Sequence, residues 1–124
     1  MGTFRTAGVI EHHVHRKRSV HVPKLLVDTG SEYTWIAEPT LRGIGVTPEK
    51  KDLQFVMANG QTISRNVGFA ILRVGDRFTV DEVVFAQPGD LELLGARTLE
   101  GLNLAVDPRG KRLVSAGPRL AAAA

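Results

Sequence analysis

Short apolar stretches separated by turn residues run along the whole chain. Val, Ile, Leu and Thr fill most of these stretches, and thirteen Gly and six Pro residues punctuate the chain. This pattern is typical of many short strands rather than of long amphipathic helices. The sequence therefore predicts a mostly antiparallel β fold.

The first predicted element is a hairpin near the N-terminus. It pairs residues 3–15 with residues 20–28 across a turn at residues 16–19. After a further turn, residues 33–36 are aromatic and β-favouring, so we expect another strand there. A short helical or irregular turn should follow from Glu38, ending at Gly43 or Gly45.

The middle of the chain predicts a second hairpin, preceded by a charged loop over residues 47–52. Asn59-Gly60 lies between two apolar runs, and this dipeptide is the strongest short hairpin signal because both residues tolerate positive φ. Residues 53–57 would form the strand that enters this turn. The returning strand is expected over residues 67–74.

The rest of the chain predicts shorter elements. They are a tight turn at Gly75-Asp76, a strand over residues 78–85, a turn at 88–90, a short apolar segment at 91–95, a helix over 96–101, and strands over 102–106 and 111–114. The expected fold class is all-β: a closed barrel with one short C-terminal helix. We expect a single domain over residues 1–120 and a tail over residues 121–124, since no repeat or internal boundary is visible.

Composition narrows the cellular setting. No apolar stretch approaches the roughly 20 residues that span a bilayer, so no membrane partner is expected. The N-terminal residues lack a charged and then apolar leader, and the chain has no cysteine for disulfides or thiolate metal sites. We therefore expect a cytoplasmic protein.

Charge gives a weak hint of nucleic-acid binding. The net charge is +3, with a pI near 9.7, and a pI above 9 is one sign of such a function. The one dense basic run is Arg16-Lys17-Arg18. The small excess favours a solvated turn and no nucleic-acid partner. A small nucleic-acid-binding β-barrel remains an alternative, and it predicts binding that weakens steeply with salt.

Four histidines lie close together in the sequence and could hold a metal ion. An extended strand would place His13 and His15 on one side, and His21 could lie across the hairpin from one of them. The fourth is His12. The adjacent cations oppose a divalent metal. A solvent-facing hairpin is therefore favoured, and no metal or cofactor is expected.

The strongest candidate for chemistry is Asp28-Thr29-Gly30-Ser31, which follows the apolar run at residues 25–27. A carboxylate held where a buried strand breaks into a turn is costly unless chemistry uses it. About 65 residues downstream lies a second signature, Leu93-Leu94-Gly95. The alternative for Asp28 is a turn-capping role, with its side chain bonded to the following backbone N–H groups.

One carboxylate cannot hydrolyse a peptide by acid–base chemistry alone. An ionised carboxylate must take a proton from water while a protonated carboxyl donates to the carbonyl oxygen. Two carboxyls about 3 Å apart share one proton and titrate as a coupled pair. Since the chain has a single Asp-Thr-Gly, a symmetric homodimer would be needed to bring two copies of Asp28 together.

Over roughly residues 22–114, these motifs resemble the retropepsin-like aspartic proteases, in particular the small single-domain members of prokaryotes. The resemblance implies that Asp28 is the catalytic carboxylate and that Thr29 locks the two active-site loops across the dimer. It implies that the Gly30 N–H faces the carboxylate and that the Ser31 hydroxyl bonds its outer oxygen. Leu94 and Gly95 would pack behind this loop.

The resemblance also implies a flap, a hairpin that closes over bound peptide, at about residues 55–63. Its tip would be Met57-Ala58-Asn59-Gly60, which carries one Gly where retroviral members are Gly-rich. Retroviral members have an Asp after the catalytic loop and an Arg directly after the second Gly. Here Glu32 and Arg97 take similar places, and a Glu32–Arg97 ion pair is expected.

Two functions follow from this resemblance. One is an aspartic endopeptidase that acts on extended peptides as a homodimer, with no cofactor. The other is a catalytically inactive peptide-binding module of the same fold. Tyr33 and Trp35 would either pack in the core, which is favoured, or line a substrate subsite. Met57 is open between flap contact and core.

Overall fold

The structure, a computed structural model, describes residues 4–119. Over this range nine strands and two short helices follow one another. They are β1 (Phe4–Glu11), β2 (Ser19–Val27), β3 (Thr34–Ala37), α1 (Glu38–Gly43), β4 (Lys50–Val56), β5 (Thr62–Val74), β6 (Arg77–Ala86), β7 (Leu93–Leu94), α2 (Ala96–Leu102), β8 (Leu104–Asp107) and β9 (Arg112–Ser115). The all-β class is confirmed. The proposed tail at residues 121–124 lies outside the described residues.

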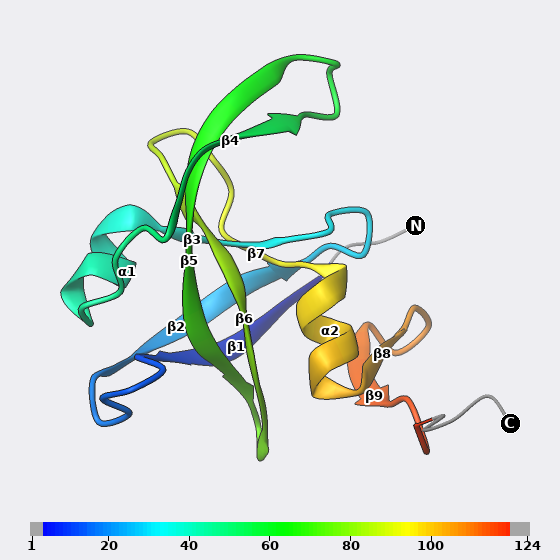
Figure 1. Ribbon diagram of the computed structural model, residues 1–124. Coiled ribbons are helices and arrows are strands. Elements are labelled where there is room, and N and C mark those ends of the chain that lie inside the picture. The colour runs from blue at the N-terminus through cyan, green and yellow to red at the C-terminus, as the bar shows by residue number, and fades with distance from the viewer. Residues whose placement is uncertain (1–3, 120–124) are drawn as a thin grey trace, which may run out of the picture.

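Seven strands form one curved sheet in the order β1-β2-β7-β3-β6-β5-β4. Its first strand, β1, also pairs with β5, so the sheet curls round on itself (Figure 1). Most neighbours are antiparallel, but β2–β7 and β3–β6 are parallel. Strands β8 and β9 pair with each other in a separate two-stranded sheet. No helix within residues 4–119 is long and apolar enough to cross a membrane.

The N-terminal hairpin has the predicted partners but a shorter first strand. β1 and β2 pair antiparallel, from Phe4 with Val27 to Glu11 with Ser19. The connecting loop begins at His12, whose Nδ1 accepts hydrogen bonds from the backbone N–H groups of Val14 and His15. This side-chain bonding ends the strand before residue 15, where the sequence prediction had placed its end.

The second hairpin differs from the prediction in two places. β4 begins at Lys50, inside the segment expected to be a charged loop, and β5 begins at Thr62 rather than at residue 67. β4 is the last strand of the sheet, so its outer side faces solvent and tolerates charged residues. The first part of β5 pairs with β4, and from Val67 onwards β5 also pairs with β6.

Both helices are short, and both follow a β segment. α1 begins at Glu38 with Pro39 in its first turn, where the missing N–H of proline costs nothing. α2 follows β7 directly and ends at Asn103, which adopts a left-handed conformation with φ 56°. The expected C-terminal helix is therefore confirmed. The turn from Glu38, left open between helical and irregular, is a second helix.

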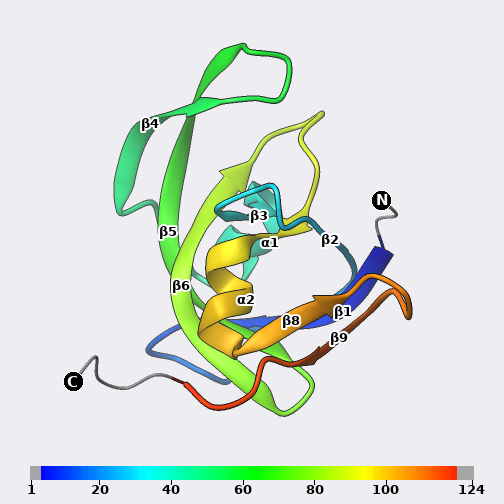
Figure 2. The ribbon, with the colours of Figure 1, turned by 90° about the vertical axis from the view of Figure 1, so that its right-hand side faces the viewer.

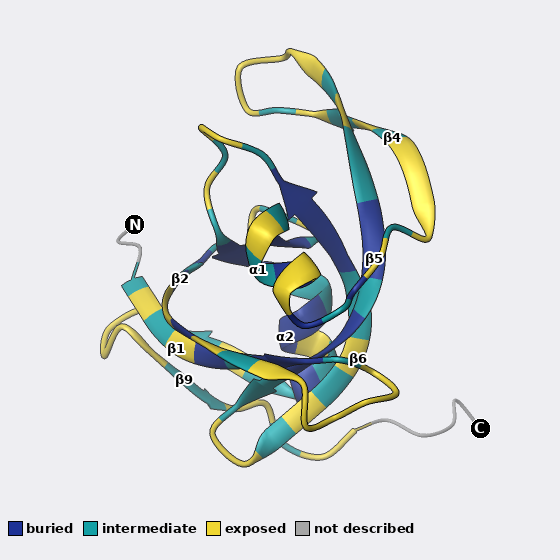
Figure 3. Cartoon of the chain, turned by 90° about the vertical axis from the view of Figure 1, so that its left-hand side faces the viewer, coloured by how far each residue is buried: buried dark blue, intermediate teal, exposed yellow. Residues whose placement is uncertain are grey.

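The core consists of two groups of buried apolar side chains. The larger is built around residues such as Ile10, Leu94 and Phe85, and it lies inside the curved sheet against the helices (Figure 3). The smaller contains Trp35 and Leu93, and the half-buried side chains of the β4–β5 hairpin pack against it. The core therefore extends from the centre of the sheet to the base of this hairpin, whereas its tip is exposed.

Candidate active site

Parallel pairing of β2 with β7 brings the two sequence signatures together. Leu26 pairs with Leu93 and Val27 with Leu94. The backbone N–H of Asp28 then donates to the carbonyl oxygen of Leu94 at 3.0 Å. The structure thus places Leu93-Leu94-Gly95 behind the Asp28 loop, where it leads into the short helix α2.

The Asp28 carboxylate is held at the start of a tight turn. The carboxylate Oδ1 accepts a hydrogen bond from the Gly30 N–H at 3.0 Å, as expected. The backbone carbonyl oxygen of Asp28 accepts one from the Ser31 N–H at 3.2 Å. Among residues 4–119, no side chain or backbone donor reaches Oδ2. Asp28 is half-buried and Thr29 is exposed. One oxygen of the carboxylate is therefore available to a water molecule or another carboxyl.

One expected contact in this loop is not formed. The Ser31 hydroxyl donates to the carbonyl oxygen of Tyr33 at 3.0 Å instead of to the outer oxygen of Asp28. The tight chain reversal between the loop and β3 places that carbonyl within reach, and an unpaired carbonyl competes well for a hydroxyl. In this chain the serine stabilises the entry into β3.

Gly95 is required by close backbone packing rather than by an unusual φ angle. A Cβ atom there would lie 2.5 Å from the carbonyl carbon of Tyr33 and 2.9 Å from the carbonyl oxygen of Glu32. The backbones meet this closely because the N–H groups of Ala96 and Arg97 donate to the carbonyls of Ser31 and Glu32. The start of α2 is thereby joined to the loop that follows Asp28.

A buried row of hydroxyls supports this junction and was missed at the sequence level. The Gly95 N–H donates to the Thr34 hydroxyl at 3.0 Å, the hydroxyls of Thr34 and Thr98 lie 2.6 Å apart, and Thr98 donates to Asp81 at 2.9 Å. Since Thr98 donates to Asp81, the Thr34 hydroxyl must donate to Thr98. Both threonines are fully buried, so the row fixes β3, β6 and α2 behind the site.

The expected Glu32–Arg97 ion pair is wrong. The Arg97 guanidinium pairs with Glu82 on β6 at 2.9 Å and lies over the Tyr33 ring, 4.7 Å from its centre. The Glu32 side chain is exposed, and only its carbonyl contacts Arg97, through the backbone N–H. The register of β6 decides this partner, and it could not be read from residues near Arg97 in the sequence.

The predicted flap is a hairpin with a four-residue tip. The Gly60 N–H donates to the Met57 carbonyl at 2.9 Å, and the Met57 N–H donates to the Gln61 carbonyl at 2.7 Å. Gly60 has φ +85°, whereas Asn59 does not have positive φ and instead accepts from the Gln61 N–H through its side chain. The turn thus uses the conformational freedom of glycine alone. Figure 2 shows this tip at the same end of the molecule as the 87–92 loop.

A cleft of about 530 Å³ lies between the Asp28 loop and the β4–β5 hairpin, and we call it the Asp28 cleft. It is lined by Asp28, Gly30, Ser31, Trp35, Val56, Met57, Ala58, Gly89, Asp90, Leu91 and Leu93. Met57 and Ala58 thus reach the cleft, whereas Asn59 and Gly60 do not line it. Trp35 is 6% exposed, so it both packs in the core, as favoured, and forms a wall of the cleft.

Among the described residues, two carboxylates line the Asp28 cleft, those of Asp28 and Asp90. Both oxygens of Asp90 are bound by the Arg65 guanidinium, at 2.7 and 2.9 Å, and one also accepts the Gln87 N–H. The Arg65 hydrogen bonds hold the pKa of Asp90 below its ordinary value. Asp90 is therefore ionised and fully bonded, and it cannot supply the protonated carboxyl that Asp28 would need. From the sequence, Asp90 was identifiable only as a turn residue.

The histidines do not converge on a site. Within residues 4–119, no group of three or more His, Asp, Glu or Cys side chains could hold a metal ion. The rings of His12 and His13 stack 5.0 Å apart, and His12 uses Nδ1 as an acceptor for its own loop. Desolvation, with the neighbouring histidines, lowers the pKa of His12.

The fold and this site together define a class: an all-β protein whose Asp-Thr-Gly loop is braced by an apolar-apolar-Gly segment and faced by a hairpin. Comparison with known families agrees. The profile of a family described as aspartyl protease matches residues 18–112. The chain therefore belongs to an aspartyl protease family of retropepsin-like type. A search of curated proteins found no match.

Proposed function

We propose that the protein is an aspartic endopeptidase whose active site forms across the two-fold axis of a homodimer. The observation that carries the proposal is the state of the two cleft carboxylates. The ionised carboxylate of Asp90 is paired with Arg65, so the Asp28 carboxyl is the one available for chemistry. Each chain has one such carboxyl in this cleft. A two-fold axis beside the Asp28 loop would supply the second from the partner subunit.

In the proposed reaction the two Asp28 carboxyls share one proton. The ionised one takes a proton from a water molecule as the water oxygen attacks the carbonyl carbon of the substrate. The protonated one donates its proton to the carbonyl oxygen. The resulting diol collapses when the newly ionised carboxylate takes a hydroxyl proton, the bond between carbon and nitrogen breaks, and the other carboxyl gives its proton to the departing nitrogen. No cofactor takes part in these steps.

Other loop residues support this chemistry. The Gly30 N–H stabilises the negative charge on Asp28 through its 3.0 Å hydrogen bond. Thr29 is exposed beside Asp28, where its hydroxyl can contact the partner subunit's loop in a dimer. The flap would then cover the bound peptide and exclude water from the dyad.

The walls of the Asp28 cleft favour extended peptides with large apolar side chains near the scissile bond. Trp35, Met57, Leu91 and Leu93 provide apolar surface, and Val56 on the flap is 76% exposed. An adjoining hollow of about 440 Å³ shares Trp35 and Val56 with the cleft and would accept a neighbouring side chain.

The Cys-free composition and the few exposed apolar residues also fit the proposed cytoplasmic location.

The direct test replaces the proposed catalytic carboxylate. Asp28→Asn should lower peptide hydrolysis by at least about a thousandfold, because the amide cannot accept the proton of water, and it should leave the fold unchanged. Asp76→Asn is the matched control, since Asp76 is exposed in the β5–β6 turn, away from the cleft. Cleavage of a peptide library by each variant would be measured with and without a statine-type mimic of the transition state. Hydrolysis retained by Asp28→Asn would eliminate the mechanism.

A second candidate is a peptide-binding module without hydrolysis. The observation in its favour is the free side of β4, which is the last strand of the sheet and could add an extended peptide by backbone hydrogen bonds. This module would bind peptides without forming product at any pH. The same library experiment separates the two functions.

A further inference from the structure

A second pocket lies on the other side of the 87–92 loop from the cleft, and we call it the α1 pocket. Its volume is about 570 Å³, within the range of small-ligand sites. It is lined by Ala37, Glu38, Pro39, Arg42, Ala86, Gln87, Pro88, Gly89, Asp90 and Glu92. Gly89 and Asp90 also line the Asp28 cleft, so one turn of the chain separates the two sites.

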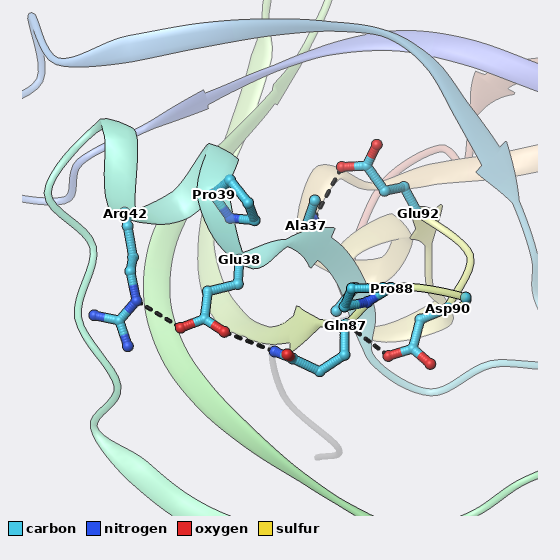
Figure 4. A pocket seen from close by; sticks show the side chains of 10 residues that line it. Ala37, Glu38, Pro39, Arg42, Gln87, Pro88, Asp90 and Glu92 are labelled. Carbon is cyan, nitrogen blue, oxygen red and sulfur yellow. Dashed lines mark hydrogen bonds and ion pairs between the residues drawn. The ribbon is translucent and has the colours of Figure 1, made fainter.

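Most polar groups of the α1 pocket bond to one another. Arg42 pairs with Glu38, the Gln87 amide donates to Glu38 at 2.7 Å, and the Gln87 N–H donates to Asp90 at 2.8 Å (Figure 4). Both oxygens of Glu38 are therefore occupied. Both oxygens of Asp90 are occupied as well, because the Arg65 guanidinium binds each of them. These contacts form one wall of the pocket and require no ligand.

Glu92 is different. One of its oxygens accepts the Ala37 N–H at 3.0 Å, and no cation pairs with its carboxylate among residues 4–119 (Figure 4). The remaining walls of the pocket are largely apolar, from Ala37, Pro39, Ala86 and Pro88. A half-buried, unpaired carboxylate beside apolar walls attracts a cation with an aliphatic stem.

We propose that the α1 pocket binds a Lys or Arg side chain of the polypeptide substrate, outside the segment that the Asp28 cleft would hold. The alkyl stem would lie against the proline and alanine side chains, and the charged head would reach Glu92. This inference rests on the proposed function for its substrate, but its ligand chemistry follows from the pocket alone. Arg42 and Arg65 offset two of the three lining carboxylates, so among the described residues the charge of Glu92 is left uncompensated and favours a cation.

The test measures binding separately from cleavage. Nα-acetyl-lysine N-methylamide would be titrated into the Asp28→Asn protein, and the amide signals of Ala37 and Gly89 would be followed by NMR. We expect weak saturable binding, with Kd of about a millimolar, and no binding of the uncharged norleucine analogue. Glu92→Gln keeps an acceptor for the Ala37 N–H, so it should fold normally and weaken lysine binding by roughly tenfold. Glu100→Gln, an exposed carboxylate on α2, should leave binding unchanged.

A second arm decides whether the ligand belongs to the substrate. With the protein carrying Asp28, cleavable peptides with a Lys outside the scissile segment should show a lower KM than norleucine peptides, and Glu92→Gln should remove that difference while keeping kcat. If Glu92→Gln left lysine binding unchanged in the titration, the assignment of the α1 pocket as a site for a cationic side chain would be overturned. Lysine binding without any KM difference would overturn the substrate assignment. Failure of all cleavage would refute the proposed function but leave the binding titration decisive for the pocket.

Discussion

At the scale of the residue, Gly95 shows how closely the two signatures depend on each other. Its contact is with backbone atoms of Tyr33 and Glu32, which cannot move aside as the end of a side chain can. Its φ of −94° is open to any residue, so the restriction is steric. A side chain at this position would push α2 away from the loop that carries Asp28.

We therefore expect Gly95→Ala to cost about 3 kcal/mol or more of unfolding free energy, as overpacking against a rigid backbone does. Activity should fall with it, because the Asp28 loop loses its support. Gly43→Ala is the matched control: Gly43 ends α1, a Cβ atom added there would meet no other atom within 4 Å, and the substitution should be neutral or slightly stabilising. Urea unfolding of both variants checks this, and an equal effect of the two substitutions would contradict the steric explanation.

Prediction from sequence was strongest for residues whose partners follow from a local motif. The Gly30 hydrogen bond to Asp28 is such a case and is present, whereas the contact of the Asp28 loop with Leu94, also present, was expected from the resemblance to retropepsin-like proteases. Prediction failed for side chains whose partners depend on strand register. Arg97 bonds Glu82, and Asp90 bonds Arg65 across 25 positions of sequence, and no short-range pattern specifies either pair.

At the scale of the element, carboxylates join strands that are distant in sequence. Glu11 on β1 binds Arg73 on β5, and Glu82 on β6 binds both Lys50 on β4 and Arg97 on α2. Hydrogen bonds from Arg73 lower the pKa of Glu11, and the Lys50 and Arg97 contacts lower the pKa of Glu82. The folded state thus favours the ionised form of each carboxylate.

The sign of the pH dependence follows from these pKa shifts. Because each folded-state pKa lies below the ordinary value of 4.5, the unfolded chain binds more protons in acid. The stabilisation is present above about pH 4.5 and should be lost as the pH falls through and below that value. Urea midpoints measured from pH 7 to pH 3 should decline at the acid end, and Glu82→Gln should decline less steeply. Glu100→Gln is the control, and a flat profile for the parent protein would refute the assignment.

Element prediction succeeded where a turn dictates the structure and was less accurate at edges. The Asn59-Gly60 and Gly75-Asp76 turns fixed two hairpins, because the glycine in each supplies the positive φ of the turn. The start of β4 was missed because charged residues usually indicate a loop, whereas here they lie on an edge strand. Pairing between β2 and β7 depends on a crossover, which local sequence does not encode.

At the scale of the whole molecule, the proposed catalysis requires two chains. One chain has a cleft, a hairpin that faces it and the Asp28 carboxyl, since the other cleft carboxylate is bound by Arg65. Two identical chains related by a two-fold axis would supply the dyad. Neither half would then be active alone, so activity should depend on association and fall upon dilution below the dimer dissociation constant.

Subunit mixing tests this claim most directly. The parent protein would be equilibrated with an equal amount of Asp28→Asn, with exchange and the mass of the active species, twice 13.5 kDa, followed by native mass spectrometry. Because mixed dimers lack one carboxylate, activity should fall to roughly half of that of the parent protein alone. The same mixture with Asp76→Asn should lose none. Unchanged activity after complete exchange with Asp28→Asn, or activity in a species of one-chain mass, would contradict a dyad shared between two subunits.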